Sequence, residues 1–238
     1  MKERPILFSS PMVRAILEGR KTQTRRVIHK MPHTLPGWWK AMHWASAGHF
    51  IKGVAEHCPY GQPGDRLWVR EAWRVGAWDE ENGQIAVDYR ADNHARREWL
   101  EVTEDDEGET FNRLWEQSCH DASAAGRQLN VQNRYKWKPG ESPCRWHPSI
   151  HMYRWASRLT LEVTGVRVER VQEITEPDAI AEGVEQYVTG PHWTQDRYRP
   201  SYRDLWDSLN AKRGYGWDTN PWVWVVEFKR MRVQEFPT

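Results

Sequence analysis

The chain has 238 residues, enough for one domain with insertions or for two small ones, so a scaffold that depends on disulfide staples is excluded. Its 34 basic and 33 acidic side chains nearly cancel, and 16 Trp and 8 Tyr supply large apolar surfaces, which excludes disorder over most of the chain. No apolar run approaches the roughly 18 residues of a membrane helix, and the beginning of the chain lacks the apolar block of a signal peptide. These features predict a globular, cytoplasmic protein.

Charge is distributed unevenly along the chain. Residues 1–26 carry seven basic and two acidic side chains, residues 92–109 carry two and eight, and residues 127–170 carry nine and three. Solvated surface charge explains any single stretch, because protein surfaces normally mix both signs. Basic side chains interleaved with Trp also suit a nucleotide or single-stranded nucleic acid, where cations meet phosphates and rings stack on bases.

The chain begins with a short helix. Ser10 and Pro11 have the residue types of an N-cap and a first helical position, the apolar residues that follow are spaced as one helical stripe, and Gly19 is placed to end the helix. The pattern predicts a helix over 11–18. Such a helix delivers the basic residues 20–26 immediately after its C-terminus.

A turn and a strand follow, and then a polar segment. The cluster at 59–65 predicts a turn, the alternation over 66–73 predicts a half-buried strand, and 85–90 could pair with that strand. From about 92 to about 150 the sequence is polar, with an acidic block and several prolines. We interpret this segment as an insertion with one helix near 110–117.

The last third returns to regular structure. The β-branched residues of 158–171 are divided by Gly165, which predicts a hairpin or a bulged strand, and the apolar run of 222–233 predicts a closing buried strand. Between these strands we expect a smaller insertion at about 185–215. Many short strands with a few small helices predict a compact barrel of the α+β class.

A second short helix is predicted over 175–182. Thr175 and Asp178 stand at the spacing of a capping box, and Gly183 is placed to stop the helix. Glu182 therefore lies at the end of this helix.

Three motifs together resemble the ASCH domain family, which has a PUA-like β-barrel fold. They are GRKTQTRR (19–26), PGDRLWVRE (63–71) and ITEPDAIAEGV (174–184), in the order of the family. The resemblance covers about 10–90, about 150–185 and the closing strand, and the long middle segment is similar to the larger, phage-associated branch. It implies one ASCH/PUA-like domain over 1–238, with short flanking helices and the two insertions.

The family resemblance also implies an activity and a set of catalytic residues. Small ASCH proteins are implicated in hydrolysing acylated cytidines such as N4-acetylcytidine, without a cofactor, and motif matching assigns their Lys, Thr and Glu to Lys21, Thr24 and Glu182. The chemistry is reasonable by itself, because a Thr hydroxyl becomes nucleophilic when a lysine of lowered pKa accepts its proton. Residues 21 and 24 of a regular strand face opposite ways, so Lys21 must lie in the turn after Gly19 for the two to converge.

The second motif supplies candidate substrate-binding residues. Strand alternation puts Glu71 on an apolar face, either as a buried carboxylate in the pocket or as the partner of an arginine of the first motif. Trp68 and Trp73 could stack on a base or fill the core. With Arg26 and Arg70, these residues form the predicted substrate-binding set.

Metal binding is not predicted. Cys144 and His147 have a C-x-x-H spacing, but His57 and Cys58 are adjacent, whereas a structural zinc site normally has two spaced pairs. Whether Cys58, Cys144 and His147 nevertheless bind a metal stays open. Three functions also stay open: an amidohydrolase acting on an acylated nucleoside, a non-catalytic PUA-like module that binds RNA or modified nucleic acid, and a ribonuclease using the same cleft. The expected partner is a modified nucleoside or single-stranded nucleic acid, and not a membrane.

Overall fold

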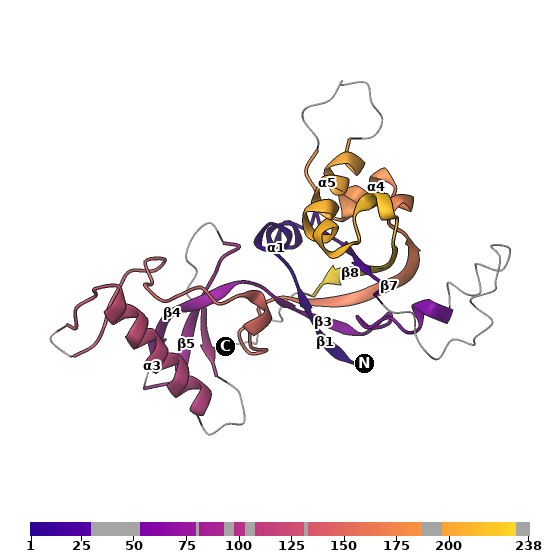
Figure 1. Cartoon of the computed structure of the whole chain (residues 1–238). Helices are drawn as coiled ribbons and strands as arrows, with labels where there is room; N and C mark the ends of the chain where they lie inside the picture. The colour runs from indigo at the N-terminus through magenta and orange to yellow at the C-terminus, as the bar shows by residue number, and fades with distance from the viewer. Residues whose placement is uncertain are drawn as a thin grey trace. The chain divides into compact units, whose positions relative to one another are not determined.

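The computed structural model in Figure 1 shows a chain of mixed α and β structure, which confirms the predicted class. The residues described are 1–29, 53–79, 81–92, 98–102, 108–130, 133–186 and 197–231. The chain divides into two compact units. The first unit comprises 1–5, 15–67 and 159–238, and the second comprises 6–14 and 68–158.

A five-stranded sheet organises the first unit, and two of its strands, β1 and β3, continue across the division into the second. In sheet order the strands are β1 (Glu3–Leu7), β3 (Arg66–Arg70), β7 (Thr160–Arg170), β8 (Trp222–Arg230) and β2 (Gln23–Val27). β8 pairs antiparallel with both β2 and β7. The closing strand predicted at the end of the chain is therefore an inner strand of the sheet, buried as its apolar sequence requires.

Strand β7 contains a bulge rather than a hairpin. Its register against β8 shifts between Val163 and Gly165, where Gly165 pairs with Glu227. A Cβ atom at position 165 would lie 2.6 Å from the Glu227 Oε2 atom, so a larger residue would require the Glu227 side chain to move. The bulged strand, one of the two expectations for 158–171, is confirmed.

The short helices begin and end close to their predicted limits. Helix α1 covers Ser10–Leu17, and α4 covers Glu176–Ala181. The Thr175 side chain accepts a hydrogen bond from the Asp178 backbone N–H, and the Asp178 carboxylate accepts one from the Thr175 N–H, which completes the predicted capping box. Gly183 follows the helix with a φ of +80°, as expected of a glycine that stops a helix.

The predicted smaller insertion contains helix α5 (Arg199–Asn210), which packs into a hydrophobic cluster. Tyr202 and Trp206 on this helix are buried in a cluster with residues of β2, β8 and α4. The members of this cluster are Val27, Val171, Ile174, Ala179, Tyr202, Trp206, Val223 and Val225. Residues 187–196 of the predicted insertion lie outside the described part of the chain.

Short 3-10 helices complete the described elements. They are η3 (Ser149–His151), η4 (Val171–Glu173), η5 (Ala211–Arg213) and η6 (Trp217–Thr219).

The second unit contains a sheet of its own. Its order is β4 (Trp73–Asp79), β5 (Gln84–Tyr89) and β6 (Glu98–Glu101), and helix α3 (Glu109–Ala124) accompanies it. The single strand predicted over 66–73 is wrong in this respect, because β3 ends at Arg70 and Trp73 begins a strand of a different sheet. Accordingly, 85–90 pairs with β4 and not with β3.

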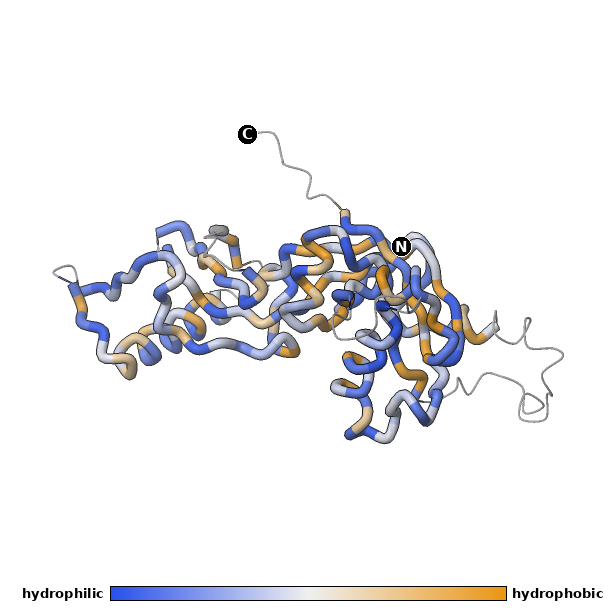
Figure 2. The backbone as a smooth tube through the Cα atoms, turned by 90° about the horizontal axis from the view of Figure 1, so that it is seen from above, coloured by the Kyte–Doolittle hydropathy of each residue, from blue (hydrophilic) through white to orange (hydrophobic). Residues whose placement is uncertain are grey.

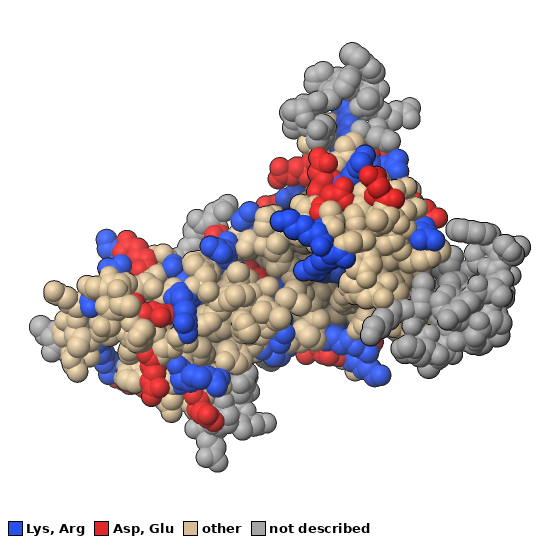
Figure 3. Space-filling model, viewed as in Figure 1, with Lys and Arg blue, Asp and Glu red and all other residues tan. Residues whose placement is uncertain are grey.

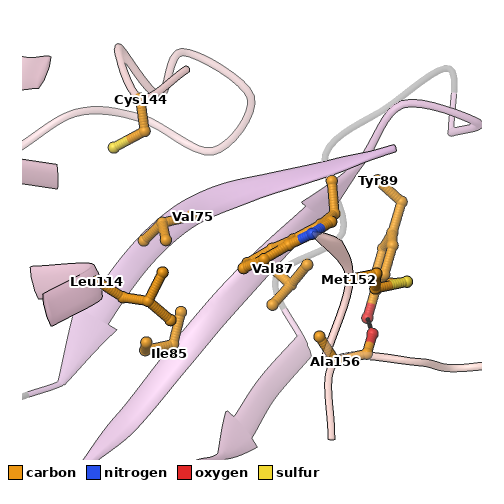
Figure 4. Packing of buried hydrophobic residues seen from close by; sticks show 9 residues of the cluster. Val75, Ile85, Val87, Tyr89, Leu114, Cys144, Met152 and Ala156 are labelled. Carbon is orange, nitrogen blue, oxygen red and sulfur yellow. Dashed lines mark hydrogen bonds between the residues drawn. The ribbon is translucent and has the colours of Figure 1, made fainter. Parts of the chain in front are cut away.

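A hydrophobic cluster stabilises the second unit. Trp73, Val75, Ile85, Val87 and Tyr89 pack from β4 and β5 (Figure 4). Leu114 and Cys144 come from the segment predicted as a polar insertion, and Met152 and Ala156 follow that segment. The Tyr89 hydroxyl donates a 2.8 Å hydrogen bond to the backbone oxygen of Ala156. The predicted insertion therefore contributes to a core. Figure 2 shows hydrophobic and hydrophilic residues alternating along the described chain.

The finer prediction of a closed PUA-like barrel stays a prediction. The described strands form one five-stranded and one three-stranded sheet, and no closed barrel is found within them. In the part of the chain that the structure describes, no helix combines the length and apolar character needed to cross a membrane.

Candidate functional site

The first unit brings Lys21 and Glu182 together, although 161 positions separate them in the chain. Gly19 ends α1 with a φ of +76°, and Lys21 then forms an antiparallel bridge with Glu182 at the end of α4. The backbone N–H of Thr22 donates to the Ala181 oxygen at 2.8 Å. The two segments approach so closely that a Cβ at Gly183 would lie 2.8 Å from the Lys21 Cβ, which explains the glycine.

The Lys21 amine is completely enclosed. Its side chain is 0% exposed and that of Glu182 is 4% exposed. Nζ donates to the Glu182 Oε2 atom and to the Glu182 backbone oxygen, both at 2.8 Å. Burial lowers the pKa of Lys21; the Glu182 carboxylate opposes this effect, while the charges of Arg26 and Arg25 add to it. A lysine in this environment gives up its proton more readily than a lysine in water.

Arg25 is the second cation at this carboxylate. Its Nη1 lies 3.2 Å from the Glu182 Oε1, so that Glu182 is held between Lys21 and Arg25. Arg25 also pairs with Glu169, and its Nη2 lies 3.4 Å from the Asp178 Oδ2. We call these five residues the Lys21 cluster. Sequence reasoning did not include Arg25, although its position four residues after Lys21 in an extended segment could have indicated the shared face.

Thr24 lies in strand β2, between two residues that contact α4 or the residue that follows it. Gln23 donates to Asp178 at 2.8 and 3.1 Å and Arg25 contacts Glu182, so one face of β2 points toward α4. Alternation directs Thr24 to the other face, where it is 3% exposed and is paired in register with Val226. Lys21 directly follows the turn that ends α1: its backbone N–H donates to the Ala15 oxygen at 3.0 Å, and β2 begins two residues later at Gln23. The convergence of Lys21 and Thr24 stays a prediction.

The predicted substrate-binding residues divide between the two units. Arg26 lies on the same face of β2 as Thr24, whereas the other four belong to the second unit. Trp73 is 0% and Trp68 8% exposed, and both occupy buried positions. The guanidinium of Arg70 lies over the Trp68 ring, 4.6 Å from its centroid. These positions correspond to the core-filling alternative for the two tryptophans.

Glu71 forms an ion pair, but with a partner that the sequence did not indicate. It is 1% exposed and accepts two hydrogen bonds from Arg158, at 2.9 and 3.0 Å. Arg158 also donates to both carboxylate oxygens of Asp92, at 2.9 and 2.8 Å. Its guanidinium lies 3.9 Å from the centroid of the Tyr89 ring. We call Glu71, Arg158 and Asp92 the Arg158 cluster; it replaces the pairing with an arginine of the first motif.

The candidate metal ligands have other surroundings. Cys58 is buried, and burial raises its pKa to about 11. Cys144 is part of the hydrophobic cluster of the second unit, and His147 stacks on Trp73 with 4.8 Å between ring centroids. Burial lowers the pKa of His147. Among the described residues, no three His, Cys, Asp or Glu side chains are grouped so that they could hold a metal ion.

Comparisons with known proteins do not assign the chain to a family. The chain matches no protein-family model, no curated protein and no solved structure. A function for the chain is therefore inferred from its own residues and their geometry.

Proposed function

We propose that the chain is an ASCH-like amidohydrolase with a PUA-like barrel, which acts in the cytoplasm on an acylated nucleoside such as N4-acetylcytidine. The observation that carries the proposal is the contact between Lys21 and Glu182, at 2.8 Å. These are two of the three residues that the resemblance assigns to catalysis, and they come from distant motifs. A pairing of this kind supports a shared role for the two motifs.

The lowered pKa of Lys21 supports its role as a general base. In the proposed reaction the Thr24 hydroxyl attacks the acetyl carbonyl and its proton passes to the Lys21 amine. The bond between the carbonyl carbon and N4 breaks, and the amine leaves with a proton from Lys21 or Glu182. Water then hydrolyses the acyl-Thr24 ester to acetate and free hydroxyl. This step requires the Thr24 hydroxyl and the Lys21 amine to lie within reach of each other when substrate is bound.

The test is incubation of the full chain with N4-acetylcytidine, followed by chromatography for cytidine and acetate. We expect Thr24→Ala and Lys21→Arg to lower the rate at least 100-fold, because the first removes the nucleophile and the second places a guanidinium where a base is needed. Thr22→Ala is the matched control, since Thr22 is an exposed threonine of the same segment. Its rate should equal that of the wild type.

Two outcomes contradict this proposal. A Thr24→Ala variant as active as the wild type removes Thr24 as nucleophile. A wild-type protein inert towards N4-acetylcytidine and towards a panel of other acylated nucleosides removes the hydrolase altogether.

A non-catalytic PUA-like module that binds RNA or modified nucleic acid is the second candidate. The complete burial of the Lys21 side chain favours it, because an enclosed ion pair can serve the fold alone. Figure 3 shows basic and acidic side chains interspersed on the face in view, so binding should be weak and should decrease with salt. Under this alternative, Thr24→Ala binds single-stranded nucleic acid as the wild type does, and neither protein hydrolyses the nucleoside.

A further inference from the structure

The second unit contains a pocket that none of the candidate catalytic or substrate-binding residues lines. Its volume is about 390 Å³, within the range of small-molecule sites. Residues of β4, the turn after it, β6 and an extended segment line the pocket. They are Ala77, Trp78, Asp79, Glu81, Trp99, Arg134, Tyr135, Lys136 and Trp137. We call it the tryptophan pocket.

Aromatic rings form much of the wall of the tryptophan pocket. Trp78 and Trp137 pack edge to face with 5.2 Å between ring centroids, and the indole N–H of Trp137 donates to the Gly76 oxygen at 2.5 Å. These contacts fix both rings. Trp99, on strand β6, is 43% exposed, which is unusual for so large an apolar side chain. The pocket thus combines two fixed indoles with a third that is open to solvent.

The charged side chains of the pocket differ in how far they are already engaged. The Asp79 carboxylate accepts hydrogen bonds from the Asn82 side chain at 2.8 Å and from the backbone N–H groups of Glu81 and Asn82 at 3.1 and 3.3 Å. These bonds, with that of the Asn82 side chain contributing most, lower its pKa. Asp79 therefore serves the turn, and the charge of Arg134 also contributes to its lowered pKa. Arg134 and Lys136 are exposed cations of the lining, and Glu81 is its second carboxylate.

We propose that the tryptophan pocket binds a base of single-stranded nucleic acid. The base stacks on the open face of Trp99, and the neighbouring phosphates contact Arg134 and Lys136. Each of these two features has its own physical basis: indole faces stack on any base, and basic side chains along a groove follow the phosphates. A quaternary ammonium ligand also favours tryptophan cages, but here it would meet Arg134 and Lys136, and Asp79 is engaged by the turn.

The proposal extends beyond the proposed hydrolase, because no residue of the tryptophan pocket belongs to the Lys21 cluster. Failure of this proposal can also be distinguished from failure of the proposed hydrolase. Loss of oligonucleotide binding in a Trp99 variant that still hydrolyses N4-acetylcytidine separates the two sites, and an inert enzyme that binds the oligonucleotide through Trp99 removes only the hydrolase.

The experiment measures fluorescence anisotropy of a fluorescein-labelled six-nucleotide oligothymidylate with the full chain at low salt. We expect Trp99→Ala to weaken binding about 10-fold or more and Trp99→Phe to retain most of it, because the phenyl ring keeps a stacking face. Lys136→Ala should weaken binding and reduce its salt dependence. Lys138→Ala is the matched control, since Lys138 is an exposed lysine of the same segment that does not line the pocket, and it should bind within about twofold of wild type.

Thermal unfolding of each variant establishes that it is folded. Wild-type protein that does not bind the oligonucleotide, or folded Trp99→Ala that binds it as tightly as wild type, overturns the proposal. The last measurement tests whether small ligands compete with the oligonucleotide. Displacement of the oligonucleotide by thymidine monophosphate but not by choline supports a nucleobase site, and displacement by choline alone assigns the pocket to ammonium ligands and overturns it.

Discussion

The two buried ionic clusters have opposite arrangements of charge. In the Lys21 cluster one carboxylate, Glu182, is held between two cations, whereas in the Arg158 cluster one cation is held between Glu71 and Asp92. The type of cation determines which proton chemistry each cluster can support. A buried lysine has a lowered pKa and can exchange a proton, but the guanidinium of Arg158 has a raised pKa: its hydrogen bonds and charge pairing with Glu71 outweigh burial, the largest single influence. Of these two buried cations, Lys21 is therefore the one from which a proton is more readily removed.

The largest effect on stability is expected when Arg158, the single cation of the Arg158 cluster, is removed. Arg158→Met leaves the carboxylates of Glu71 and Asp92 without their shared partner, and Glu71 is 1% exposed. We expect the free energy of unfolding to fall by about 3–5 kcal/mol, the usual cost of an uncompensated buried charge. Chemical denaturation measures it. Lys229→Ala, which breaks an exposed pair with Glu162, is the control and should change it by about 1 kcal/mol or less.

Neutralising the central carboxylate of the Lys21 cluster is the corresponding test in the first unit. Glu182→Gln keeps the shape but removes the charge between Lys21 and Arg25, so we expect a loss of about 3 kcal/mol. The pKa of Lys21 should fall further, because the attraction that opposes burial is gone. Denaturation and the pH dependence of N4-acetylcytidine hydrolysis measure the two effects. An unchanged stability would mean that the carboxylate contributes nothing to the cluster.

The close approach that creates the Lys21 cluster can be disturbed without changing a charge. Gly183→Ala introduces a Cβ 2.8 Å from the Lys21 Cβ and 2.9 Å from the Ala15 Cβ, at a φ of +80°. Gly19→Ala has the same backbone strain, with a φ of +76°, but its Cβ meets no described atom within 4 Å. We expect the free energy of unfolding, measured by thermal unfolding, to fall by about 2–3 kcal/mol for Gly183→Ala and by about 1 kcal/mol for Gly19→Ala. Equal losses would show that the contact with Lys21 is unimportant.

The smallest effect concerns Asp178 at the edge of the Lys21 cluster. Hydrogen bonds from Thr175 and Gln23 and the charge of Arg25 overcome burial and lower its pKa to about 2. A carboxyl whose folded pKa lies below its unfolded value stabilises the fold above the unfolded value, and this stabilisation is lost as pH falls from about 4 to 2. Because the group is partly exposed, we expect about 1 kcal/mol. Asp178→Asn should lack this component when unfolding is measured from pH 5 to 2.

Local signals in the sequence were sufficient for the elements near the candidate site. The capping box of Thr175 and Asp178 predicted α4, and the position of Gly165 left a hairpin or a bulged strand for 158–171, because caps and bulges depend on neighbouring residues. The approach of Lys21 to Glu182 followed from the family resemblance. Mixed α and β structure was predictable; closure into a barrel stays a prediction.

Long-range partners were beyond reach of the sequence. Glu71 pairs with Arg158, 87 positions later, and nothing local distinguishes this arginine from the others. The place of Lys21 relative to Thr24 depended on where the strand begins, and β2 begins at Gln23, two residues after Lys21. The contribution of the predicted insertion to the core of the second unit was missed because its apolar residues, such as Leu114 and Cys144, are scattered through a polar segment.

The pairing of β2 with β8 has a consequence for synthesis of the chain. Gln23 is paired with Glu227, so β2 waits until about 200 further residues have been made before its partner exists. At a ribosomal rate of about 5–20 residues per second, this delay is roughly 10–40 s. The hairpin of β4 and β5 closes over a few residues and can form much earlier. During that interval residues 23–27 lack the strand with which they pair, so a nascent chain stalled before β8 should depend on chaperones or aggregate.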